Sequence, residues 1–105
     1  MEPAYVRALN QGKAVHAYEN EIRIQNQGVN KMHADLDAMD RDIADMEAEL
    51  VSDGVSPRRR KALLEEIRVR EEDRRLLLDD LSSAEHGVEE MQHNLERMKV
   101  RNPYR

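Results

Sequence analysis

The residues best suited to chemistry in this chain are its four histidines, His16, His33, His86 and His93. Glu90 and His93 have the Glu-x-x-His spacing of the pairs that bind metal in di-iron helical bundles. Such a site needs two of these pairs and two more glutamates, all pointing inward. This chain has one pair, and both of its residues fall on the predicted polar side of a helix. A metal-binding bundle around His16, Glu90 and His93 is therefore the least favoured hypothesis, and we expect no cofactor.

Other catalytic constellations are missing from the sequence. The absence of cysteine removes disulfides, thiolate chemistry and Cys-ligated zinc together. No glycine-rich phosphate loop, Ser/His/Asp arrangement or calcium loop is present. Closely spaced aspartates such as Asp37 and Asp40 are typical of a solvated helix face. We predict that the protein is not an enzyme.

A heptad repeat of aliphatic residues predicts the helices that carry these side chains. Counting in sevens gives six aliphatic residues at position a, namely Val15, Ile22, Val29, Leu36, Ile43 and Leu50. Position d holds Tyr18, Gln25, Met32, Met39, Met46 and Asp53. Such spacing in a chain with 37% charged and 3% aromatic residues predicts a long helix that packs against another helix along this seam.

A turn signal lies near the middle of the chain. Gly54 is a natural left-handed stop after a helix. Ser56 is a good N-cap, and Pro57 suits the first helical position that follows. A stop, a cap and a restart within a few residues predict a tight helical hairpin.

The predicted fold is all-α: an antiparallel hairpin of two long helices with coiled-coil packing, forming a single domain over residues 1–105. We expect helices at about 3–51 and about 57–101, a turn at 52–56 and a short C-terminal tail.

Two arginines, Arg70 and Arg74, interrupt the otherwise aliphatic seam of the second helix. A hairpin centred on Gly54 sets residue i opposite roughly residue 108 − i, which places both arginines near Asp35 and Asp37. Seam arginines need carboxylate partners. We therefore predict ion pairs between these residues, which a partner chain could also supply.

The core of one hairpin is thin, because most positions beside the seam are polar. Leu64, Leu76 and Leu78 lie beside the second seam and are expected to widen its apolar face. Small scaffolds rarely stand on so little buried surface. We expect a homodimer that forms a four-helix bundle, or a hairpin that completes its core on another protein.

Charge is segregated along the chain, although the net charge is only −5. Residues 34–53 hold eight acids and one base, whereas residues 54–70 hold six bases and two acids. The densest basic run is Arg58, Arg59, Arg60 and Lys61 at the predicted hairpin tip. This run could contact phosphate or an acidic partner. Neutralisation by Glu47, Glu49 and Asp53 at the facing helix end is the structural alternative.

These patterns favour a non-enzymatic protein–protein interaction module, a small coiled-coil adaptor, chaperone-like subunit or inhibitor that presents a helix face to another protein. The alternative is a nucleic-acid-related regulator. It would contact RNA or DNA through the basic tip, or imitate a phosphate backbone with Asp35, Asp42 and Glu49. The longest aliphatic run, residues 76–78, is far too short for a membrane span. We expect a cytoplasmic protein.

Overall fold

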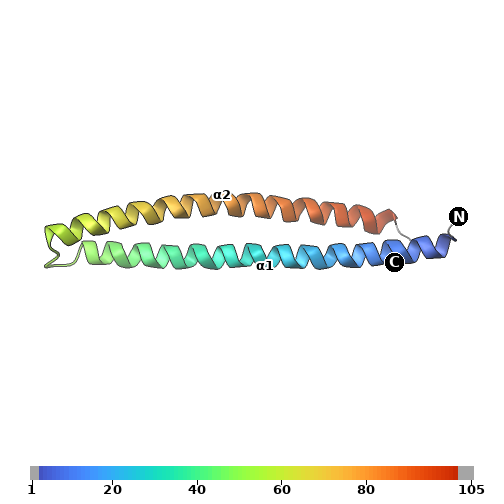
Figure 1. Ribbon diagram of the computed structural model, residues 1–105, viewed down its shortest axis with the longest axis horizontal. Helices are drawn as coiled ribbons and strands as arrows, with labels where there is room; N and C mark the ends of the chain where they lie inside the picture. Colours follow the sequence, from blue (N-terminus) through green and yellow to red (C-terminus); the bar gives the residue numbers. More distant parts are fainter. Residues whose placement is uncertain (1–2, 102–105) are drawn as a thin grey trace. The chain divides into compact units, whose positions relative to one another are not determined.

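Two long helices make up the part of the chain that the structure describes. The structure is a computed structural model, and it describes residues 3–101. Helix α1 spans Ala4–Leu50 and helix α2 spans Pro57–Arg101, with no strand in the described range. The two helices pack against each other in opposite directions (Figure 1). The predicted antiparallel hairpin is confirmed, and the predicted C-terminal tail lies outside the described residues.

The turn between the helices uses the residues that its sequence indicated. Ser52 closes α1, since its Oγ donates a hydrogen bond of 2.6 Å to the carbonyl oxygen of Glu49. Gly54 has φ of 83°, in the left-handed region where a side chain would be strained. Ser56 caps α2, because its Oγ accepts a hydrogen bond of 3.1 Å from the backbone N–H of Arg59.

The heptad seam forms the core. All ten buried apolar side chains of the described residues lie at seam positions: Val15, Ile22, Val29, Leu36 and Ile43 on α1, and Leu63, Ile67, Leu81, Val88 and Leu95 on α2. Their exposed fractions do not exceed 9%, and Leu63 is completely buried. The seam methionines Met32, Met39, Met46, Met91 and Met98 are half-buried beside them. Burial therefore follows the a and d positions on both helices.

The hairpin divides into two compact units. The turn unit is Asn30–Ser82, and the terminal unit is Met1–Val29 with Ser83–Arg105. Each unit contains a segment of α1, a segment of α2 and its own share of the buried seam. The features with functional interest lie mainly in the turn unit.

Contacts between the helices fix how they are aligned within each unit. In the turn unit, Asp42 contacts Arg70 and Asp40 contacts Arg74. In the terminal unit, the Asn94 amide contacts the Tyr18 hydroxyl at 3.4 Å. These pairs set residue i opposite roughly residue 113 − i, so the predicted alignment about Gly54 is wrong.

The shift in alignment comes from the start of α2. With the observed alignment, Leu50, the last seam residue of α1, stands level with Leu63. Helix α2 begins at Pro57, so about one and a half turns precede its first buried seam residue. The chain reverses at Gly54, but matching of the two seams decides which residues face each other.

Candidate interaction surface

The seam arginines bind aspartates of α1, but not the ones predicted. Arg74 Nε lies 2.6 Å from Asp40 Oδ1, and Arg70 Nη1 lies 3.4 Å from Asp42 Oδ2. The predicted partners were Asp35 and Asp37. The observed alignment moves both away from the arginines: Asp35 instead pairs with Lys31 on its own helix, and the Asp37 side chain is exposed.

Partial exposure limits what these cross-helix pairs contribute. The side chains of Arg70 and Arg74 are 41% and 38% exposed, and their aspartate partners are more exposed still. Solvated pairs of this kind typically contribute about 0.2–1 kcal/mol each. Their main effect is to let charged side chains occupy seam positions without leaving a charge buried and unpaired.

At the hairpin tip, one of the four clustered bases is tied to α1. Arg59 binds Glu49 with two hydrogen bonds, Nε to Oε2 at 2.5 Å and Nη2 to Oε1 at 3.0 Å. The Arg59 hydrogen bonds lower the pKa of Glu49, and the same contact raises the pKa of Arg59. Within residues 3–101, no ion pair joins Glu47 or Asp53 to the cluster, and Arg58, Arg60 and Lys61 are exposed without one. Their positive charge opposes the dipole at the start of α2.

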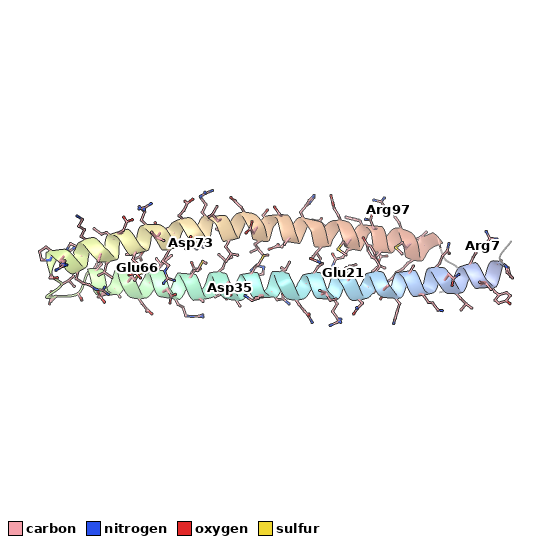
Figure 2. The ribbon with its side chains drawn as sticks, in the orientation of Figure 1. Arg7, Glu21, Asp35, Glu66, Asp73 and Arg97 are labelled. Atoms are coloured by element: carbon pink, nitrogen blue, oxygen red, sulfur yellow. The ribbon has the colours of Figure 1, made fainter. Side chains whose placement is uncertain are left out.

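An acidic edge runs along one side of the turn unit. It consists of the position-g carboxylates of both helices: Asp35, Asp42 and Glu49 on α1, and Glu66, Asp73 and Asp80 on α2. In the observed alignment each α2 carboxylate lies about two residues along the helix from the level of an α1 carboxylate. Figure 2 shows Asp35, Glu66 and Asp73 on one side of the unit, near the line where the two helices meet.

The acidic edge is only partly neutralised. Its α1 row has three cationic contacts, made by Lys31, Arg59 and Arg70. In the described chain, no cation lies within ion-pair distance of the three α2 carboxylates. Like charges at neighbouring levels repel each other, weakly here because solvent screens them. Polar residues beside the seam, Asp73 and Asp80 included, were predicted, but they were not joined with Glu66 as one row, which their sevenfold spacing indicates once the seam is assigned.

The outer row of α2, at heptad positions b and f, is balanced by contrast. Arg68 pairs with Glu65 at 2.7 Å, while Arg75 pairs with Glu72 at 2.7 Å and with Asp79 at 3.4 Å. Hydrogen bonds from these arginines lower the pKa of Glu65 and of Glu72. Charge on this outer row is therefore satisfied within the helix itself.

Four large aliphatic side chains of α2 in the turn unit lie outside the seam and are exposed. Their exposed fractions are 53% for Leu64, 43% for Val69, 49% for Leu76 and 38% for Leu78. At about 100° per residue, Val69 and Leu76 lie on the side of the acidic edge, whereas Leu64 and Leu78 lie on the other side. The expectation that Leu64, Leu76 and Leu78 widen a single apolar face is therefore wrong.

The histidines are exposed on the two helices. His86 Nε2 lies 3.1 Å from Glu90 Oε1, so the Glu90 carboxylate contacts His86 and not His93. A hollow of about 620 Å³ beside His16 is lined by α1 side chains alone. Among the described residues, no three His, Asp or Glu side chains are placed to hold a metal ion.

Neither hydropathy nor similarity assigns a role to the hairpin. Within residues 3–101, neither helix offers a stretch long and apolar enough to span a bilayer. Comparisons of the chain with protein-family models, with curated proteins and with solved structures find no match.

Proposed function

We propose that the protein is a non-enzymatic interaction module, a small adaptor, chaperone-like subunit or inhibitor that presents a helix face to a partner protein. One observation carries this proposal. The seam of the turn unit is filled, yet α2 keeps four exposed aliphatic side chains outside it, and a row of carboxylates that make no ion pair within residues 3–101. A cysteine-free composition supports a cytoplasmic location as part of the same proposal.

A two-helix hairpin leaves the outer faces of both helices uncovered. Its helices are held by one narrow seam, and their outer faces remain available to another molecule. A helix face that carries apolar residues at regular spacing is a common way to bind a partner helix. Binding would also stabilise a thin core, since any ligand of the folded state shifts the folding equilibrium.

Site-specific photo-cross-linking in the native cell tests partner binding. A photoreactive residue is placed at Val69 in one variant and at Leu64, on the other side of α2, in a matched control. We expect the Val69 variant to form one dominant adduct with a single protein, and the control to form much less of it. If neither variant, nor others that sample both helices, forms a dominant adduct, the interaction proposal is wrong.

Self-association is a separate part of the proposal, because the thin core also motivates a homodimer. Sedimentation equilibrium should then give a mass of about twice 12.3 kDa. A mass of one chain across the accessible concentration range would exclude the homodimer without affecting partner binding.

A nucleic-acid-related role is the second candidate. The three tip bases without ion pairs, Arg58, Arg60 and Lys61, favour phosphate contact, and the acidic edge favours imitation of a phosphate backbone. Contact through the tip predicts binding to a short DNA or RNA duplex that falls steeply between 50 and 200 mM salt and is lost when the three bases become glutamine. Equal binding by that variant would exclude the tip. The mimic predicts competition with duplex DNA for a basic protein, and its absence would exclude that form.

A further inference from the structure

We propose that the acidic edge, together with the exposed Val69 and Leu76, is a docking site for a basic amphipathic helix of a partner protein. This inference rests on the proposed function and names the face and the chemistry of the occupant. All of its residues belong to the turn unit.

The apolar part of the site is a stripe on α2. Ala62, Val69 and Leu76 recur every seven residues and are all exposed. Seven helical residues rise about 10.5 Å, so the stripe matches apolar residues at i, i+7 and i+14 of a helix laid alongside it. This is the spacing by which one amphipathic helix anchors on another.

The charged part alternates with the stripe along the same helix. Each apolar residue is followed four positions later by a carboxylate, in the order Ala62, Glu66, Val69, Asp73, Leu76 and Asp80. Across the line where the helices meet, the α1 row adds Asp35 and Asp42. Asp35 and Asp42 are already paired with Lys31 and Arg70, whereas the three α2 carboxylates make no ion pair within residues 3–101. An occupant that fits both features carries Lys or Arg beside its apolar anchors, because its cations would then lie over the α2 carboxylates.

The same features decide between possible occupants. A bare phosphate mimic has no use for apolar side chains, whereas this face has two aliphatic residues that are 43% and 49% exposed. A second copy fits less well. Its basic and apolar strip, which carries Arg68 and Arg75, is already neutralised by carboxylates of the same helix. The remaining occupant is a helix of another protein with basic and apolar residues on one face.

The test uses synthetic helical peptides and the full chain. The probe is a labelled 21-residue peptide with leucine at three positions seven apart and lysine or arginine beside them. One matched peptide replaces the leucines with serine, and another replaces the bases with glutamate. Fluorescence anisotropy at 50 and 150 mM salt measures binding, and circular dichroism checks that each protein variant stays helical.

Two sets of protein variants locate the site. The edge variant combines Glu66→Gln, Asp73→Asn and Asp80→Asn. The outer-row control combines Glu65→Gln, Glu72→Gln and Asp79→Asn, which removes the same number of charges from the balanced side. A second pair of double variants removes the aliphatic side chains. One combines Val69→Ser and Leu76→Ser, and its control combines Leu64→Ser and Leu78→Ser.

We expect the edge variant to bind the basic apolar probe about tenfold more weakly or worse, and the outer-row control within about twofold of wild type. The Val69 and Leu76 substitutions should weaken binding more than their controls, and the serine peptide should bind more weakly than the leucine peptide. Equal weakening by edge and outer-row variants would overturn the proposal, as would equal binding of the leucine and serine peptides.

Three other outcomes also overturn it. If the chain alone forms oligomers that the edge variant dissolves, the occupant is a second copy. If cross-linking in cells captures a partner only through residues outside this face, the assignment of the face is wrong while the interaction module stands. If cross-linking captures no protein at any position, the proposed function fails as well.

Discussion

Leu63→Ala is the substitution that most directly tests the packing of the hairpin, because the chain supplies its own control. Leu63 is completely buried at the end of the seam, and the next residue, Leu64, is 53% exposed. The two variants lose the same atoms from the same helix, one residue apart. Any difference in stability between them therefore reports burial and not composition or helix propensity.

The expected magnitude follows from the burial of Leu63. Leucine-to-alanine substitutions in protein cores cost about 2–5 kcal/mol, according to how far the neighbours collapse into the space. A two-helix seam can close more easily than a globular core, so we expect about 2–3.5 kcal/mol for Leu63→Ala. In a domain of this size that corresponds to a melting temperature lower by about 10–25 °C. Leu64→Ala should change the unfolding free energy by no more than about 0.5 kcal/mol.

Thermal and urea unfolding followed by circular dichroism at 222 nm measure both variants. All samples need one protein concentration, because self-association would make the midpoint depend on it. Equal destabilisation by Leu63→Ala and Leu64→Ala would refute the assigned seam. A larger effect at Leu64 would mean that the seam is displaced by one residue.

Three further predictions address the turn, the alignment and the pH dependence. Gly54→Ala should destabilise the hairpin by about 1 kcal/mol, because its φ of 83° strains any side chain, whereas Gly28→Ala, in open space on a helix, should stabilise it by about 0.5–1 kcal/mol. Urea titration decides, and the opposite order of stability would contradict the structure. A double-mutant cycle between Arg74 and Asp40 should give a coupling free energy of roughly 0.2–1 kcal/mol, and zero coupling would contradict the alignment. The pKa of Glu49 lies below its ordinary value of 4.5, so its contribution is present above that pH and is lost as the pH falls through the folded-state pKa. The melting-temperature advantage of wild type over Glu49→Gln should therefore shrink between pH 7 and pH 3, and an unchanged difference would contradict the pair.

Much of the fold could be predicted from the sequence because two independent signals agree. Aliphatic residues seven apart define the buried face, and Gly54 with Ser56 defines where the chain reverses. The alignment of the helices could not be taken from the turn alone. It depends on how many residues of α2 precede Leu63, and only matching of the last seam residue of α1 to the first of α2 gives the correct pairing.

The surface was harder to predict because net charge was counted along the chain and not around the helix. Residues 54–70 sum to a basic segment, which hides the fact that Glu66 and Arg68 point to different sides of α2. Asp73 and Asp80 follow this segment in the sequence, so counting charge by segment did not place them in one row with Glu66. Assigning each charge to its heptad position separates the acidic edge from the balanced outer row.

Removing charge from the acidic edge and from the outer row is predicted to have opposite effects on the stability of the hairpin. The edge carboxylates of α2 make no ion pair within residues 3–101, although Glu66 interacts electrostatically with Arg59. They lie beside the α1 row, so their neutralisation should relieve repulsion and raise the melting temperature. The outer-row carboxylates are bound by arginines that lower the pKa of Glu65 and Glu72. Neutralising these carboxylates should therefore lower the melting temperature at pH 7.

Differential scanning calorimetry of the two triple variants, each against wild type, measures these signs. If the edge variant is more stable and yet binds the basic peptide less well, its carboxylates contribute to recognition at the expense of the hairpin's stability. If the edge carboxylates only stabilised the fold, the edge variant would be less stable and would bind the peptide equally well. A lower melting temperature for the edge variant would mean that these carboxylates support the hairpin, which would contradict their assignment to partner binding.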